Sequence, residues 1–376
     1  MAFLASPSSS PAPSTGTSSP ALSSTTAFSS PPTSFRSSGP SVQPVSTPDV
    51  YLSESNGRQA GLFTARPLRR GERILCEEPL LALDSPATLP EALLRLSVED
   101  RTAFYELANA YEGDPRSSRE RGIFDTNAFS LSPEIRFSSS GPSPASFGIF
   151  RITSRFNHSC RPNVRTSYHP SSRSMQVHVL TDVAAREELF TTYLGRQNLY
   201  GLNTDTRKMR LKRGWGFDCS CPVCLLLPAE QEASDSRRSE LAGLRAGLPG
   251  LRPIDAEKVL LHCGRARDLL EAEGLFLDSD EFTSVAAKVC AWHKDWASAK
   301  VWAELARTSA SAEYGERSEL ASRLAEGVKD PKRLLPAGVG GDKRDLGRVT
   351  RELLASSVPT TTPHSSVSFF SRIFVR

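Results

Sequence analysis

Three cysteines lie within six residues of this 376-residue chain, in the order Cys219-x-Cys221-x-x-Cys224. This spacing is typical of metal ligands, but a structural zinc ion takes four ligands in a tetrahedron, so one is missing locally. The best candidate for the fourth is Cys160, which lies in the polar stretch 155–163. Four thiolates would leave no open position for catalysis, so the predicted metal is structural. Unliganded surface thiols are the alternative.

The other cysteines have different surroundings. Cys76, Cys263 and Cys290 lie inside strand or helix patterns, and we expect them to be small buried apolar residues. The chain has seven cysteines in all and no recognisable export signal, which favours metal ligation over a disulfide framework.

The stretch 155–163 reads Arg-Phe-Asn-His-Ser-Cys-Arg-Pro-Asn. It is too polar for an ordinary strand and too short for a helix, and its residue types prefer turns and side-chain-to-backbone hydrogen bonds. Between apolar neighbours it predicts a buried irregular loop with a function. Taken singly, Asn157 could cap a turn, His158 could be a core histidine, and Tyr193 further along could be a packing residue.

Charge and composition limit the functional classes. The net charge of +4 demands neither nucleic acid nor a membrane surface as partner. The chain has one short basic run, formed by Lys208, Arg210, Lys212 and Arg213. Such a run is more typical of a solvated helix face, so a zinc-dependent nucleic-acid binder is the weakest hypothesis. No apolar run is long enough to span a bilayer, and the N-terminus lacks a basic region of the secretory kind. We expect an intracellular protein, in nucleus or cytoplasm.

The elements that must position these residues are short. Period-two alternation and Gly-containing turns predict strands at 50–52, 62–65, 72–77, 175–179 and 189–193, with a tight turn at 56–61. A helix is predicted at 89–111 because apolar residues repeat on one face, followed by a polar loop at 113–121.

The two ends of the chain differ from its middle. Residues 1–48 are rich in Ser, Pro and Thr and are predicted to be disordered, as is most of 328–376. Between 237 and 327 the spacing is helical. Two apolar stripes joined by a turn at 293–295 predict an antiparallel helix hairpin. The stripes are Phe282, Val285, Ala286, Val289 and Cys290, then Trp296, Ala299, Trp302, Ala303 and Ala306.

Taken together, the stretches 155–163, 187–193 and 219–224 resemble the SET-domain lysine methyltransferases that carry a post-SET zinc strip. Residues 57–63 resemble the cofactor-binding turn of that family, and residues 126–129 the segment that enters its central loop. The resemblance covers about 49–83 and 123–227. More weakly, the helices after 237 resemble the C-terminal helical hairpins of the SET-and-MYND branch.

The resemblance implies a mostly β fold with α insertions. Small β-clip-like sheets would surround a threaded C-terminal segment, and an α-helical region would follow. The implied boundaries are a SET domain at 49–200 with a helical or loop insertion at about 84–147, a post-SET zinc strip at 201–227 and a TPR-like helical region at 237–327.

The resemblance also implies a chemistry, methyl transfer from S-adenosylmethionine to a lysine side chain of a protein substrate, histone or non-histone. Tyr193 is the implied catalytic residue, and its hydroxyl would orient the lysine amine. Tyr193, Trp215 and Phe217 would line the lysine channel. The implied cofactor-binding residues are Arg58, Gln59, Ala60, Asn127, Asn157, His158, Tyr193 and Phe217, and the implied zinc ligands are Cys160, Cys219, Cys221 and Cys224.

Three departures from the family pattern are visible. Residues 84–147 contain neither Cys nor His, so the MYND zinc finger is missing there; Arg186 replaces a turn glycine; and Trp215 replaces a tyrosine. They are compatible with a second hypothesis, a weakly active or inactive SET-fold scaffold that binds partners through its helices. For either hypothesis we expect a monomer without nucleic-acid or membrane contacts.

Overall fold

The computed structural model describes residues 47–55, 58–131 and 146–356. The predictions for residues 1–46 and 357–376 therefore fall outside the described residues. All described residues belong to one compact unit. Within the described ranges, no helix is both long and apolar enough to cross a membrane.

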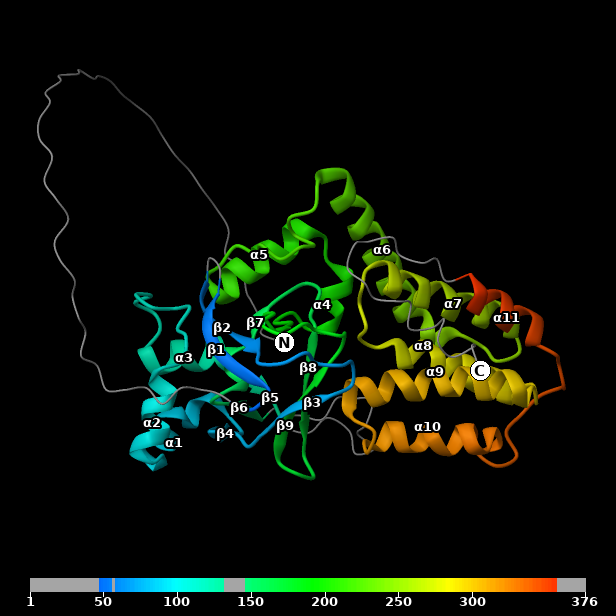
Figure 1. Ribbon diagram of the computed structural model, residues 1–376, viewed down its shortest axis with the longest axis horizontal. Helices are drawn as coiled ribbons and strands as arrows, with labels where there is room; N and C mark the ends of the chain where they lie inside the picture. Colours follow the sequence, from blue (N-terminus) through cyan, green and yellow to red (C-terminus); the bar gives the residue numbers. More distant parts are fainter. Residues whose placement is uncertain (1–46, 56–57, 132–145, 357–376) are drawn as a thin grey trace, which may run out of the picture. The chain divides into compact units, whose positions relative to one another are not determined.

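Four small sheets build the first half of this unit (Figure 1). Apolar residues of several strands meet in a common core, among them Val50, Leu62 and Val177. Two sheets are antiparallel and three-stranded, in the orders β3-β9-β8 and β4-β6-β5; β1 pairs antiparallel with β2, and β7 pairs parallel with β10. The strands are β1 (Val50–Ser55), β2 (Arg58–Thr64), β3 (Arg73–Glu77), β4 (Leu81–Leu83), β5 (Phe129–Ser130), β6 (Phe147–Ile149), β7 (Asn157–His158), β8 (Val164–His169), β9 (Ser174–Val179) and β10 (Phe190–Thr191).

Helices form the insertion and the C-terminal half. This arrangement confirms the predicted fold class of small sheets followed by a helical region. The α-helices are α1 (Leu89–Arg95), α2 (Val98–Tyr105), α3 (Arg119–Asn127), α4 (Arg196–Gly201), α5 (Thr204–Trp215), α6 (Pro228–Gly247), α7 (Ala256–Ala272), α8 (Ser279–Trp292), α9 (Trp296–Tyr314), α10 (Glu319–Lys329) and α11 (Gly347–Ala355).

The helix expected at 89–111 is wrong as a single element. It is broken after Arg95, because Leu96 is extended and Ser97 caps α2 by accepting a hydrogen bond from Asp100 N at 3.0 Å. The loop expected at 113–121 is present at 113–118, and its last three residues begin α3, which Ser118 caps in the same manner.

Smaller corrections concern the strands. Of the turn expected at 56–61, residues 58–61 belong to β2, and residues 56 and 57 lie outside the described residues. In the stretch 189–193 only β10 is a strand, since the chain leaves the ladder after Thr191. Cys76 is exposed rather than buried, because its side of β3 faces away from the core.

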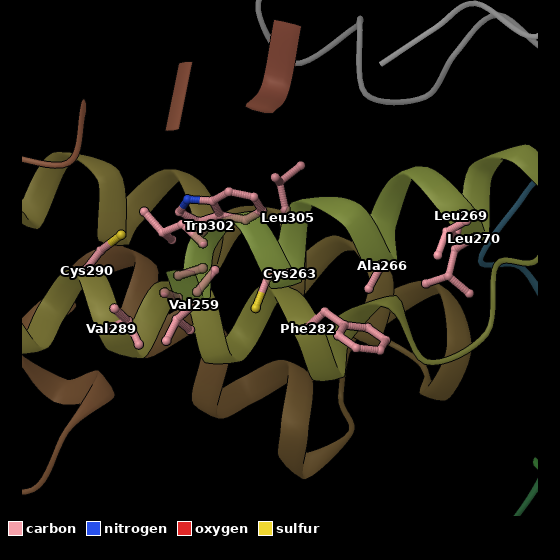
Figure 2. Packing of buried hydrophobic residues seen from close by; sticks show 14 of the residues in the cluster. Val259, Cys263, Ala266, Leu269, Leu270, Phe282, Val289, Cys290, Trp302 and Leu305 are labelled. Carbon is pink, nitrogen blue, oxygen red and sulfur yellow. The ribbon is translucent and has the colours of Figure 1, made fainter. Parts of the chain in front are cut away.

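The helical core contains the predicted hairpin. Helices α8 and α9 pack against each other and α10 packs against α9, as Figure 1 shows. Figure 2 shows Trp302 beside Leu305, and Val259, Cys263 and Phe282 in the same cluster. Trp296, predicted in this stripe, is 37% exposed because it begins α9 at the edge of the cluster.

The tail predicted to lose order after residue 328 is ordered up to residue 356. Leu346 is buried, α11 packs on α7, and Trp302 Nε1 donates to Thr350 Oγ1 at 3.2 Å. Composition hid this helix, because it is short and follows a segment rich in Gly and Pro. Helix α6 likewise begins at residue 228, nine residues before the predicted start.

Candidate active site and metal centre

The polar loop is threaded beside a strand from a distant part of the chain. β7 and β10 pair in parallel, with Asn157 opposite Phe190 and His158 opposite Thr191. Asn163 fixes the register, because its Oδ1 accepts from Phe190 N at 2.6 Å while its Nδ2 donates to Glu188 O at 2.9 Å. The buried irregular loop predicted from the sequence is therefore present.

Asn157 connects this loop to β2. Its Nδ2 donates to Ala60 O at 2.9 Å and to Glu188 Oε1 at 2.7 Å. Both amide hydrogens are thus committed, which orients Oδ1 as an acceptor toward the other side. Gly61 is required at its position, because a Cβ there would lie 2.2 Å from Glu188 Oε1 and 2.7 Å from Asn157 Nδ2. Ser55 Oγ also donates to Glu188, at 2.8 Å.

His158 is only 1% exposed and bridges the loop to the segment after β10. Its Nδ1 lies 3.0 Å from the backbone N of Tyr193 and accepts that hydrogen. The ring is therefore neutral with its hydrogen on Nε2, which lies 3.4 Å from Cys160 Sγ. One imidazole links the predicted catalytic tyrosine to a predicted metal ligand.

Tyr193 lies among aromatic rings. Its centroid is 5.2 Å from Trp215, 5.4 Å from His158 and 6.2 Å from Phe217, and the last pair meets edge to face. Rings at these separations form an apolar wall around the phenol. The structure thus brings the three predicted channel residues together.

The hydroxyl of Tyr193 has a fixed direction. It donates to Phe156 O at 2.9 Å, and the residue is half-buried rather than turned out into water. A phenolic oxygen whose hydrogen is engaged retains acceptor capacity, so this oxygen can orient an N–H group of a substrate.

Trp215 supplies no hydrogen to the channel. Its Nε1 donates to Thr126 O at 3.0 Å, which ties the end of α5 to the insertion. The neighbouring Asn127 is buried at the end of α3, and its Nδ2 donates to Ala108 O and Ile123 O, both at 2.7 Å. Its amide hydrogens are therefore used within the insertion, and its contact with a cofactor stays a prediction.

The four predicted metal ligands converge. Cys160, Cys219, Cys221 and Cys224 are all buried, and their sulfur atoms lie within 4.8 Å of one another. The sulfurs of Cys160 and Cys224 are 3.7 Å apart. A tetrahedral zinc with Zn–S bonds of about 2.3 Å has sulfur–sulfur edges of about 3.8 Å, so the donor set fits this ion.

The chemistry of the thiols points the same way. Hydrogen bonds from Cys160 and Cys221 lower the pKa of the Cys219 thiol far below its ordinary value, and the contact with Cys219 raises the pKa of Cys160. Protons are therefore shared unevenly when no cation is bound. A divalent cation would allow all four groups to be thiolates, which are the forms that bind metal.

Arg186 adopts the conformation expected of the glycine that it replaces. Its φ is 67°, in the left-handed region, and its N donates to Thr64 O at 2.9 Å. A non-glycine residue pays roughly 1–2 kcal/mol there. The turn therefore keeps its shape despite the substitution.

Comparison with known proteins is consistent with this geometry. A family model described as SET domain matches residues 59–194, which include the loop at 155–163 and Tyr193. Residues 59–194 are a SET domain. The Cys219–Cys224 triplet follows the SET domain after α4 and α5, within the strip predicted at 201–227.

Curated relatives extend the similarity beyond the SET domain. The histone-lysine N-methyltransferase set5 of Schizosaccharomyces pombe is 28% identical over 275 residues, 72% of this chain and 81% of that protein. The protein-lysine N-trimethyltransferase SMYD5 of Gallus gallus is 29% identical over 99 residues, 26% of this chain and 23% of that protein. The SET5 protein of Yarrowia lipolytica, another histone-lysine N-methyltransferase, is 37% identical over 76 residues, 20% of this chain and 16% of that protein.

Some residues that organise the site were not foreseen. Ser55, Glu188 and Arg238 do so through hydrogen bonds, yet polar residues of these types are common on surfaces and carry no spacing signal. Of the predicted first-turn residues, Ala60 accepts from Asn157, whereas the side chains of Arg58 and Gln59 lie outside the description.

Proposed function

We propose that this chain is a protein-lysine N-methyltransferase that uses S-adenosylmethionine. The observation that carries the proposal is the position of the Tyr193 hydroxyl, pinned to Phe156 O among the rings of His158, Trp215 and Phe217. The SET domain supports it, and so do the names of the relatives, which are histone-lysine and protein-lysine methyltransferases.

The aromatic wall accounts for the required protonation state. A lysine amine attacks only when neutral, and its ordinary pKa is about 10.4. An apolar channel disfavours the ammonium form and lowers that pKa, so no dedicated protein base is needed. Tyr193 would then accept an N–H of the amine and turn the nitrogen lone pair along the channel.

The cofactor would lie between β2 and the polar loop. The residues proposed to hold it are those predicted above, with Asn157 Oδ1 as an acceptor for its cationic amine and the backbone at 58–60 as the opposite wall. When bound, S-adenosylmethionine supplies an activated methyl on a sulfonium. The protein's part is to orient the amine and exclude water.

A structural zinc ion is proposed for the cysteine quartet, where it would hold the strip at 217–224 against the loop at 157–160. Fold and charge leave open which protein is methylated. By analogy with the relatives we propose a histone or another protein lysine, and a chain acting as a monomer in the nucleus or cytoplasm.

Transfer of a radiolabelled methyl group from S-adenosylmethionine to proteins of a cell lysate tests the activity. Tyr193→Phe removes only the orienting hydroxyl, and we expect labelling to fall about 100-fold, the usual effect of misplacing a reacting group. Tyr105→Phe is the matched control. It removes a hydroxyl that bonds Glu120 in the insertion, and labelling should be unchanged.

The same assay separates the proposal from the scaffold hypothesis. A scaffold predicts wild-type labelling no higher than that of Tyr193→Phe. That result, obtained with folded protein, would overturn the enzyme assignment.

A further inference from the structure

The N-terminal half of α6 covers the cysteine cluster. Gln231 Nε2 donates to Cys224 O at 3.1 Å, one turn after the helix begins. Asp235 lies four residues after Gln231, and Arg238 lies three residues after Asp235. These spacings place the three side chains on the same face of the helix. This half of α6 therefore lies against the backbone of two predicted metal ligands.

Arg238 holds the Cys160 peptide directly. Its side chain is 0% exposed, and Nη2 donates to Cys160 O at 3.1 Å while Nη1 donates to Leu199 O at 3.2 Å. Its Nε donates to the buried carboxylate of Glu273 at 2.7 Å. The planar guanidinium thus joins the loop at 155–163, α4 and the end of α7 in one fixed geometry.

Arg207 joins α5 to α6. It is also 0% exposed, and its Nη1 contacts Asp235 Oδ1 at 3.0 Å while Nη2 donates to Thr204 Oγ1 at 2.9 Å. Its Nε is buried and has no hydrogen-bond partner within the described part of the chain. Because Asp235 lies three residues before Arg238 in α6, this contact fixes the part of α6 that carries Arg238.

Both guanidinium groups are paired with carboxylates, Arg207 with Asp235 and Arg238 with Glu273. The pairs therefore add little net charge near the cysteines, and their effect on a bound ion comes from the geometry that they fix. The hydrogen bonds and charges around a metal's direct ligands commonly decide how firmly the ion is held.

We propose that Arg207 and Arg238 are positioning residues of the metal centre, which retain the ion by fixing the Cys160 peptide, Arg238 directly and Arg207 by holding α6 through Asp235. The inference rests on the zinc site proposed above. It makes α6 part of the metal centre and not only the connection to the helical region.

Metal release from the full-length, zinc-loaded chain tests this. Zinc transfer to a chromogenic chelator is followed well below each variant's own unfolding temperature. We expect Arg207→Gln and Arg238→Gln to release zinc 10–100-fold faster than wild type. Arg245→Gln is the control, since Arg245 also belongs to α6 but binds Glu281, and its release rate should match wild type.

Lysine variants separate charge from geometry. Arg207→Lys keeps the charge and should restore most of the retention. Arg238→Lys should not, because an ammonium cannot serve Cys160 O, Leu199 O and Glu273 in one plane. If Arg238→Gln does not fold, the two Arg207 variants decide. If Arg207→Gln and folded Arg238→Gln both release zinc at the wild-type rate, the role of the arginines is overturned and the zinc site stands. If the wild-type chain binds no zinc, the zinc site is overturned as well.

Discussion

At the scale of single residues, Glu188 determines how the predicted cofactor loop is presented. Its carboxylate accepts from Ser55 Oγ and Asn157 Nδ2, and Gly61 leaves the space in which it lies. Without this acceptor the Asn157 amide could rotate and exchange its oxygen for its nitrogen. The amide oxygen that faces the cofactor's cationic amine would then be replaced by an N–H group. Two hydrogen-bond donors would face each other there, and they repel each other.

Glu188→Ala removes this acceptor and therefore should weaken cofactor binding. A hydrogen bond to a charged group contributes about 1.5–3 kcal/mol, and 1.4 kcal/mol corresponds to a factor of ten in affinity. We expect the dissociation constant for S-adenosylmethionine, measured by calorimetry, to rise about tenfold or more. Glu187→Ala, one exposed residue away, should change it less than twofold; equal effects of both variants would contradict the role given to Glu188.

At the scale of elements, the contact between α7 and α11 is close. A Cβ on Gly264 would lie 2.6 Å from Leu353 Cδ2 and 3.3 Å from its Cγ, so the glycine makes room for the α11 side chain. Helix α11 is short and depends on this packing, because isolated helices of its length are marginal in water.

Gly264→Ala should loosen α11. Alanine favours a helix by about 1 kcal/mol over glycine, but the overpacking of Leu353 costs about 1–3 kcal/mol, so we expect net destabilisation. Gly243→Ala is the control, because nothing lies within 4 Å of its Cβ position, and it should stabilise α6. Urea unfolding measures both, and equal stabilisation by the two substitutions would argue against the packing role.

The elements also show which structural information local patterns contain. Apolar residues at period two and turn residues between them identified β1, β3 and β9, and helical spacing identified the α8–α9 hairpin, because apolar residues of these elements enter the cores. The break between α1 and α2 carried a signal that was missed, since Ser97 followed by Asp100 is a typical capping pattern. No local pattern places Arg238 against Cys160, because that contact depends on tertiary packing across 78 residues.

At the scale of the whole described unit, charged groups are buried where β8 meets α9. Glu313, Asp278 and Asp280 are at most 2% exposed. Arg165 Nη1 lies 3.1 Å from Glu313 Oε2 and 3.6 Å from Asp278 Oδ1. Arg245 Nη1 reaches Asp278 Oδ2 only at 3.7 Å. Burial, followed by the charge of Asp280, raises the pKa of Glu313 to about 8.

This raised pKa makes stability depend on pH. The carboxyl of Glu313 ionises near its ordinary pKa of 4.5 in the unfolded chain and near 8 in the folded chain, so the folded state binds the extra proton between these limits. The contribution is present below about pH 4.5 and is lost as the pH rises toward 8, by up to about 1.4 kcal/mol per pH unit. Glu313→Gln cannot lose a proton and should lack this decline.

The measurement is the difference in free energy of unfolding between Glu313→Gln and wild type, at several pH values from 5 to 8. We expect this difference to shift in favour of the variant as the pH rises. Other titrating groups, such as the buried His178, contribute to both proteins and largely cancel. A difference that does not change with pH would show that Glu313 is ionised throughout.

Finally, the separation of the cysteines along the chain gives the ion a topological effect. Cys160 precedes Cys219 by 59 residues, and β8, β9, β10, α4 and α5 lie between them. A bound ion therefore acts as a cross-link that closes a long loop, comparable to a disulfide, for which the chain-entropy model gives about 4 kcal/mol at this length. Tyr193 lies inside that loop, so removal of the ion would return conformational freedom to the segment whose rigidity the transfer of a methyl group requires.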